Sequence, residues 1–146
     1  MRLGKMGKVV AAGLFTAGLF AAGLAQAATV KFTTALKGSD EVPANTTTGV
    51  GAVSAKLDTE TKLFSYTVTY SGLSGPATMA HFHGPAAPGV NAPPIITVTT
   101  LASPITGTAT LTAAQIADLT AGKWYFNVHT AAHKGGEIRG QLQAAP

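Results

Sequence analysis

The fold is decided by the stretch KLFSYTVTY, residues 62–70, in which large apolar side chains alternate with polar ones. Because successive side chains of a strand point to opposite faces, this alternation predicts a strand with one buried face. Residues 49–58 alternate in the same way, and the turn-prone tetrapeptide 58–61 connects the two stretches. Together they predict a β-hairpin. The side chains on the expected buried face of its second strand are Phe64, Tyr66, Val68 and Tyr70.

Similar alternation recurs along the chain, interrupted by Gly-Pro and Pro-Pro pairs that are typical of turns. A capping-box pattern, Thr112 to Gln115, and the later Gly122 predict one short helix between them. About eight strands with one short helix predict an all-β fold, an antiparallel Greek-key β-sandwich or barrel. The further expected strands are 29–36, 78–83, 95–101, 105–111, 123–130 and 137–143.

The composition of the chain indicates one domain and limits its chemistry. Of 146 residues, 46% are hydrophobic and only 11% are charged, and there is no cysteine. This length suits a single core, and the hydrophobic content excludes intrinsic disorder. Without cysteine, the chain has no thiolate nucleophile, no Cys-ligated zinc and no blue-copper site. A metal site would need histidines and carboxylates.

The first 27 residues have the pattern of a secretory signal. Arg2, Lys5 and Lys8 precede an uncharged run, 9–24, which ends at Ala25-Gln26-Ala27, a small-x-small cleavage pattern. The run is shorter than the roughly 20 strongly apolar residues that a membrane helix needs. We therefore expect a signal peptide over 1–27, a mature β-domain over 28–146 without a membrane span, and a periplasmic or secreted location.

The basic charge of the chain lies partly in this signal. The formal net charge is +4, but three of the ten basic residues precede residue 28. The mature part is therefore close to neutral, and its charges are scattered along the sequence. No basic stripe with interleaved aromatic residues is present, so a nucleic-acid partner is not expected.

The four histidines fall in two short segments. His81 and His83 occupy alternate positions of the expected strand 78–83, so their side chains leave one face about 7 Å apart along the strand. His129 lies near the end of strand 123–130, and His133 follows in the next loop. Strand alternation assigns Ala80, Phe82, Trp124, Phe126 and Val128 to the core, which places His81, His83 and His129 on the outer side, together with Met79, Tyr125 and Asn127.

Imidazoles without thiolates suit Cu(II) or Zn(II), and the Irving–Williams order favours copper. We therefore expect a metal site formed by His81, His83, His129 and His133, with copper as the cofactor and zinc as the alternative. The competing interpretation is a solvated or hydrogen-bonded group of surface histidines. Met79 lies on the same face, either as a soft axial ligand or as an ordinary packing residue.

Several motifs resemble one known family. They are LKGSDEVP (36–43), AHFHGP (80–85), GTATLT (107–112), LTAGKWYFNVHT (119–130) and GEIRGQL (136–142). This series, in order along almost the whole mature chain, resembles the CHRD domain, the module named after chordin. The resemblance implies an exported β-domain. In chordin-like proteins the module belongs to extracellular regulators that bind growth factors, and bacterial members are exported proteins of mostly unassigned function. The family's motif histidines fall on His81, His83 and His129.

More distantly, the His-x-His on a strand with a later histidine resembles copper-zinc superoxide dismutases. In that comparison Arg139 is a candidate catalytic residue, because an arginine near copper would attract and orient a small anion. The alternative for Arg139 is a structural pair with Glu137 or a solvated edge.

Two classes of function therefore stay open. One is an exported metal-binding protein with possible superoxide dismutase-like activity. The other is a non-catalytic interaction or structural module, with a protein partner or a homodimer.

Overall fold

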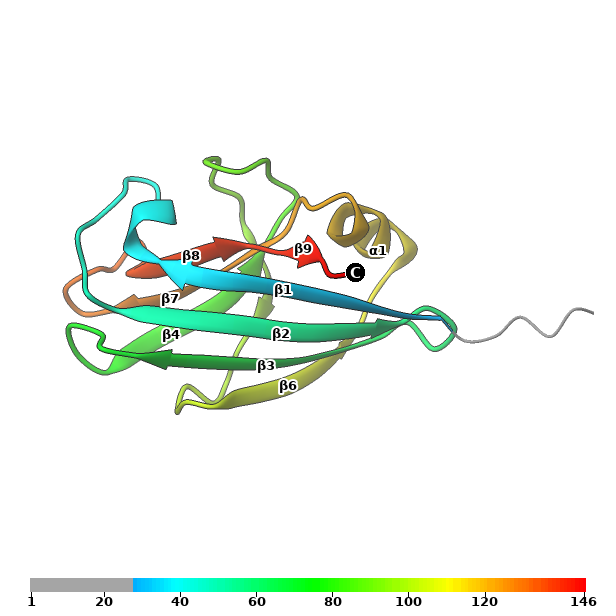
Figure 1. Cartoon of the computed structure of the whole chain (residues 1–146), viewed down its shortest axis with the longest axis horizontal. Coiled ribbons are helices and arrows are strands. Elements are labelled where there is room, and N and C mark those ends of the chain that lie inside the picture. Colours follow the sequence, from blue (N-terminus) through cyan, green and yellow to red (C-terminus); the bar gives the residue numbers. More distant parts are fainter. Residues whose placement is uncertain (1–27) are drawn as a thin grey trace, which may run out of the picture.

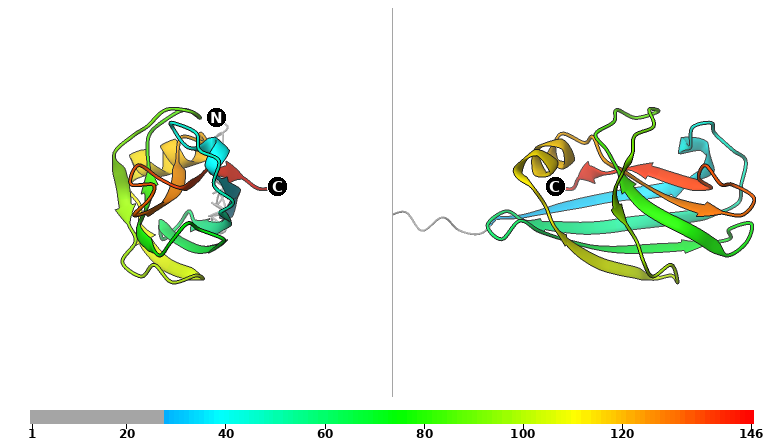
Figure 2. Two further views of the ribbon diagram at one scale, coloured as in Figure 1. Left: turned by 90° about the vertical axis from the view of Figure 1, so that its left-hand side faces the viewer. Right: turned by 180° about the vertical axis from the view of Figure 1, so that it is seen from behind.

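A computed structural model describes residues 28–146 as an antiparallel sheet that curls into a nearly closed barrel (Figures 1 and 2). The expected signal peptide, 1–27, lies outside the described residues. In chain order the elements are β1 (Thr29–Lys37), the 3-10 turn η1 (Gly38–Asp40), β2 (Val50–Asp58), β3 (Leu63–Ser71), β4 (Ala77–His83), β5 (Pro94–Thr97), β6 (Ile105–Thr110), α1 (Ala113–Thr120), β7 (Tyr125–Thr130), β8 (Ile138–Gln141) and β9 (Gln143–Ala144).

The strands lie in the order β5-β4-β7-β8-β1-β2-β3-β6, and β9 pairs with β1. Consecutive strands β3 and β4 are far apart in this order, and so are β6 and β7, so the sheet is not a simple meander. Figure 2 shows the sheet curving round on itself, with β5 and β6 at its two ends. The prediction of an all-β antiparallel fold with about eight main strands and one short helix is confirmed.

The hairpin and the helix form where the sequence predicts them. β2 and β3 pair in register, with Leu57 opposite Phe64, and the Asp58 carboxylate accepts hydrogen bonds from the backbone N–H groups of Glu60 and Thr61 at 3.0 and 2.8 Å. At the start of α1, the Thr112 hydroxyl accepts from the N–H of Gln115, whose side chain accepts in turn from the N–H of Thr112. This reciprocal capping box satisfies two N–H groups that the first turn leaves free.

Aromatic side chains fill the interior of the barrel. Phe82 lies at their centre, with its ring 5.3 Å from that of Phe64, 4.8 Å from Tyr66 and 4.7 Å from Phe126, measured between ring centroids. These tilted and edge-on contacts are the geometry that aromatic pairs prefer. The residues expected in the core from strand alternation are buried there: Phe64, Tyr66, Val68, Ala80, Phe82, Trp124, Phe126 and Val128. Tyr70, also expected on this face, is only partly buried.

The outer face of β7 and β8 is also largely buried, and so is the end of β4 at His83. Every residue of β7 is buried, so both faces of this strand are covered. The segments 84–93 and 38–49 lie over the outer face, and Asn91 joins them by donating to the carbonyl of Val42 at 3.1 Å. The expectation of surface histidines is therefore wrong for His83 and His129, which are 8% and 7% exposed, because loops cover the outer side of their strands.

We expect Phe82→Ala to lower the free energy of unfolding by about 3–5 kcal/mol, the usual cost of replacing a fully buried phenylalanine with alanine. Val50→Ala is the matched control, because Val50 is a half-exposed strand residue; its cost should stay below about 1 kcal/mol. Urea denaturation followed by tryptophan fluorescence measures both. Equal costs for the two variants would contradict the assignment of Phe82 to the centre of the core.

Candidate metal centre

Three of the four histidines converge on one point. His81, His83 and His129 each offer a ring nitrogen, and these three atoms lie within 4.8 Å of one another. Nδ1 of His81 is 3.3 Å from Nε2 of His129. Because imidazole nitrogens bind zinc-like ions at about 2.0–2.1 Å, two nitrogens on one ion lie at most about 4.2 Å apart, so the three side chains need a small inward movement to share one ion. The convergence expected for these three residues is therefore present.

Strand register brings the histidines together. β4 and β7 are antiparallel neighbours, with His81 opposite Asn127 and Met79 opposite His129. His81 and His83 lie on one face of β4 at alternate positions, and His129 lies on the same face of the adjacent strand. The ring centroids of His83 and His129 are both close to that of His81, at 5.2 and 5.1 Å.

Backbone carbonyls determine which ring nitrogens carry protons. Nδ1 of His83 lies 2.9 Å from the carbonyl oxygen of Ala92, and Nδ1 of His129 lies 2.9 Å from that of Lys134. A carbonyl only accepts, so each Nδ1 must be the donor. A neutral imidazole has one N–H, which leaves both Nε2 atoms as lone pairs. Such outer contacts are the usual way in which proteins orient metal-binding histidines.

Asn127 lies between the two lone pairs. Its Oδ1 is 3.0 Å from Nε2 of His83 and 3.0 Å from Nε2 of His129. The amide oxygen is an acceptor as well, so three electron-rich atoms face one another in a buried place. The cluster therefore has the electrostatic character of a cation site.

Burial favours the neutral form of His81 and of His83. Desolvation, followed by the charges that His129 and His83 would carry, lowers the pKa of His81 below its ordinary value. Desolvation also lowers the pKa of His83, although its contacts with the Ala92 carbonyl and with Asn127 oppose the change. Only a neutral imidazole binds a metal, so both shifts favour binding near neutral pH.

Arg139 is near the cluster but separated from it by an aromatic ring. The His83 ring stacks on Tyr125, with centroids 4.6 Å apart and ring planes within 3° of parallel. The guanidinium carbon of Arg139 lies 3.5 Å from the Tyr125 centroid. Two groups cannot stack on the same face of one ring, so Arg139 and His83 lie on opposite faces of Tyr125. Arg139 is 1% exposed and donates to Asn91 and to the carbonyl of Val90.

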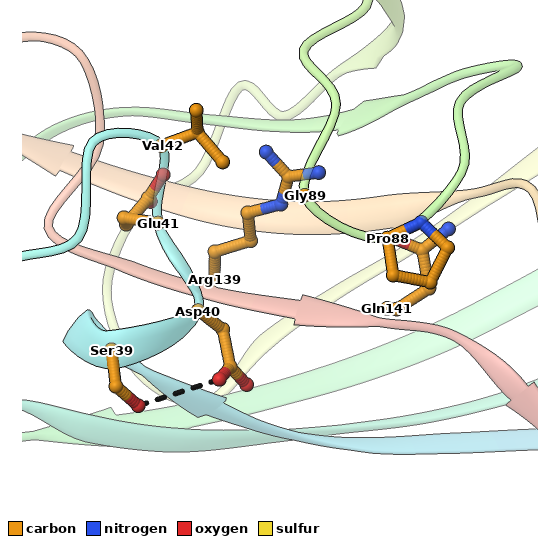
Figure 3. Close-up of a pocket in the computed structure, with 8 residues that line it drawn as sticks. All are labelled: Ser39, Asp40, Glu41, Val42, Pro88, Gly89, Arg139 and Gln141. Carbon is orange, nitrogen blue, oxygen red and sulfur yellow. Dashed lines mark hydrogen bonds between the residues drawn. The ribbon is translucent and has the colours of Figure 1, made fainter.

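Arg139 also forms one wall of a solvent-open pocket of about 380 Å³. Figure 3 shows its side chain reaching from β8 toward the loop of Pro88 and Gly89, with Glu41 nearby. Glu41 is buried, and this burial raises the pKa of its carboxyl to about 7, although the Arg139 charge and hydrogen bonding from Asn127 act in the opposite direction. Glu41 thus connects the pocket to Asn127.

Glu137 is a buried carboxylate that holds three loops together. Its oxygens accept from the hydroxyls of Thr47, Ser74 and Thr130, each at 2.6 Å, and from the N–H of Ser74 at 2.7 Å. Burial alone would raise its pKa, but these hydrogen bonds outweigh that effect and lower it to about 2. The only ion pair within 4.0 Å over residues 28–146 joins Lys123 and Asp118, so the considered Glu137–Arg139 pair is not formed, and neither residue lies on a solvated edge.

His133 and Met79 occupy other positions. His133 lies in the loop after β7, outside the group of three histidines, and its backbone atoms hydrogen-bond with Thr130 and Gly136. Met79 lies on the histidine face of β4 and is 45% exposed, so it is not a core residue.

Sequence reasoning placed Asn127 on the histidine face but did not identify it as part of the site. The sequence signal for Asn127 was its position two residues before His129, which places both side chains on the same face of the strand. Glu41 and the carbonyls of Ala92 and Lys134 gave no such signal, because loops bring them to the cluster.

The comparisons with known proteins give the family. The family model for the CHRD domain matches residues 32–142, well over half of the chain. The chain belongs to the CHRD family. All three converging histidines lie inside the matched segment of this CHRD domain, and so do Asn127, Glu41 and Arg139. Neither a curated protein nor a solved structure matches the chain. Over the part of the CHRD protein that the structure describes, no helix has the length and apolarity to cross a membrane.

We expect Glu137→Gln to lower the free energy of unfolding at pH 7 by about 2 kcal/mol or more, because hydrogen bonds to a charged group are stronger than those to a neutral one. The lowered pKa of Glu137 makes this contribution complete above about pH 4.5, the ordinary value, and lost as the pH falls toward about 2. The difference in the free energy of unfolding between wild type and Glu137→Gln should therefore become smaller as the pH falls.

Glu60→Gln, at an exposed turn position, is the control and should change stability by less than about 0.5 kcal/mol. Chemical denaturation from pH 7 to pH 2.5 measures the three proteins. If the difference in the free energy of unfolding between wild type and Glu137→Gln stays constant over this range, Glu137 does not stabilise the loops as an ionised carboxylate.

Proposed function

We propose that this CHRD protein is an exported metal-binding protein in which His81, His83 and His129 hold one divalent ion. The observation that carries the proposal is the fixed tautomer of two of these histidines. The carbonyls of Ala92 and Lys134 occupy both Nδ1 protons, so two Nε2 lone pairs face the same buried point. A cation relieves the repulsion between these lone pairs, and the proximity of His81 adds a third nitrogen.

Copper is the preferred ion, and zinc is the alternative. Three imidazoles without a thiolate suit both ions, and Cu(II) binds such a set more tightly in the Irving–Williams order. Export is supported by the signal pattern of residues 1–27 and agrees with a site that needs no reduced thiol.

Binding rather than catalysis is the function that the site supports best. An arginine that steers an anion to copper should present free N–H groups toward the open side of the metal. Arg139 lies behind Tyr125, and its terminal nitrogens donate to Asn91 and Val90. We therefore assign Arg139 to holding the loop over the histidines. Superoxide dismutase activity of the copper-loaded protein is a separate measurement and is not required by the proposal.

Replacing the ligands tests the proposal directly. We expect His83→Ala and His129→Ala each to weaken Cu(II) binding by more than about 100-fold, since changes to outer contacts alone cost 10–100-fold. Competition with a chelator of known affinity gives the dissociation constants, and electron paramagnetic resonance after one equivalent of Cu(II) reports the bound nitrogens. His133→Ala is the matched control, and its affinity and spectrum should equal those of wild type.

Equal affinity in wild type and a combined His81→Ala, His83→Ala variant would overturn the proposal. The histidines would then belong to a non-catalytic interaction or structural module, in which they only hydrogen-bond to the loops.

The pH dependence of binding is a second test. Protonation of an imidazole abolishes its lone pair, so Cu(II) affinity should be nearly constant from pH 8 to about 6.5 and fall by at least about tenfold per unit at lower pH. The lowered pKa values of His81 and His83 move the protonation of these two ligands to lower pH. Affinity that stays flat from pH 8 to pH 5 would indicate binding to carboxylates instead.

A further inference from the structure

We infer that Asn127 supplies a fourth, oxygen donor to the metal and that Glu41 holds its amide in the orientation that makes this possible. The inference rests on the proposed metal site and adds a residue that determines which oxidation state of copper the site prefers. Asn127 and Glu41 are both additional to the three histidines described above.

The distances around Asn127 match the edges of a coordination polyhedron. With metal–ligand bonds of about 2.0–2.2 Å, two ligand atoms are about 2.8–3.1 Å apart at a right angle and about 3.3–3.6 Å apart at the tetrahedral angle. Oδ1 of Asn127 lies 3.0 Å from Nε2 of both His83 and His129, and the His81–His129 nitrogen distance is 3.3 Å. These four atoms need little movement to share one ion.

Hydrogen bonding does not explain the same contacts. Nε2 of His83 and of His129 has no proton to donate, because the single proton of each neutral ring is on Nδ1. The amide oxygen of Asn127 has none either. Two contacts of 3.0 Å between acceptors, at a residue only 3% exposed, are unfavourable unless a cation lies among them.

Glu41 explains why the oxygen, and not the nitrogen, of Asn127 faces the histidines. Oε1 of Glu41 and Nδ2 of Asn127 both lie close to the position that a Cβ atom on Gly136 would occupy. The amide nitrogen of Asn127 is therefore directed toward the Glu41 carboxyl group. Reversing the amide would place its oxygen against the Glu41 carboxylate. Glu41 Oε1 is buried and has no other hydrogen-bond partner, which leaves it available to this N–H group.

Gly136 preserves the space in which Glu41 and Asn127 meet. A Cβ atom at this position would collide with Glu41 Oε1 and would lie 2.7 Å from Nδ2 of Asn127. Its φ of +130° also disfavours a side chain. The loop 131–137 therefore passes close to the pair without displacing it, while Lys134 in the same loop orients His129.

An amide oxygen is a hard donor, so it stabilises Cu(II) more than Cu(I), which prefers soft ligands. Asn127 should therefore lower the reduction potential of bound copper. This gives Asn127 a readout that a purely structural residue would not have, because loss of structure weakens both oxidation states alike.

The test compares Asn127→Leu, which removes the donor with little change in size, with Asn127→Asp, which keeps an oxygen and adds charge. Cu(II) and Cu(I) affinities are measured at pH 8 by competition with chelators specific for each state. We expect Asn127→Leu to weaken Cu(II) binding 10–100-fold and to leave Cu(I) binding unchanged. That difference raises the potential by about 59–118 mV. Asn127→Asp should lower the potential.

The outcomes separate this inference from the proposed function. A wild-type protein that binds no copper at the histidines would overturn both. Wild-type binding together with an Asn127→Leu variant of unchanged Cu(II) affinity, or of equally weakened Cu(II) and Cu(I) affinity, would overturn only the role of Asn127. If Asn127→Leu fails to fold by circular dichroism, Asn127→Asp decides: an unchanged potential would overturn the inference.

Glu41 has its own matched pair of variants. Glu41→Leu removes the acceptor that orients the amide and should raise the potential in the same direction as Asn127→Leu, by a smaller amount. Glu41→Gln keeps an oxygen that can accept from Nδ2 and should restore the wild-type potential. A wild-type potential in Glu41→Leu, or equal shifts in both variants, would remove Glu41 from the site as a positioning residue.

Discussion

A buried polar layer on the outer face of β4, β7 and β8 constrains the rest of this structure. Burying a polar group without a partner costs free energy, and burying an unpartnered charge costs much more. The protein meets this requirement with segments that arch over the layer and bring their own backbone and side-chain partners. Arg139 reaches the loop before β5, and Glu137 accepts hydrogen bonds from hydroxyls of two loops and of the last residue of β7. The covered face is a second interior, polar where the barrel interior is aromatic.

The histidine cluster derives its chemistry from this cover. Without the carbonyls of Ala92 and Lys134, each imidazole could place its proton on either nitrogen and hydrogen-bond freely with Asn127. With them, the Nε2 atoms are held as lone pairs. The Glu137 clamp matters here because it ties down the two ends of the loop that carries Lys134. Stability of the loops and the geometry of the histidine cluster are therefore linked, although Glu137 hydrogen-bonds to none of the three histidines.

Much of the fold could be predicted from local pattern. Alternation located the main strands and the core side chains, and it placed His81, His83 and His129 on one face, because strand parity is a local property. The cover over that face could not be predicted, since it depends on loops whose paths are set by contacts such as Asn91 with Val42. Local pattern also could not show which side chains lie between Arg139 and the histidines, so Arg139 was expected beside the metal. Parity gave its face correctly, but not the Tyr125 ring that separates it from His83.

The central claim is that one metal ion binds among His81, His83 and His129. A crystal structure of the protein soaked with one equivalent of Cu(II), with anomalous diffraction recorded at the copper edge, tests it most directly. We expect a single anomalous peak about 2 Å from Nδ1 of His81 and from Nε2 of His83 and His129. A peak at His133 or at the chain terminus, or histidines that keep their contacts with no peak among them, would contradict it.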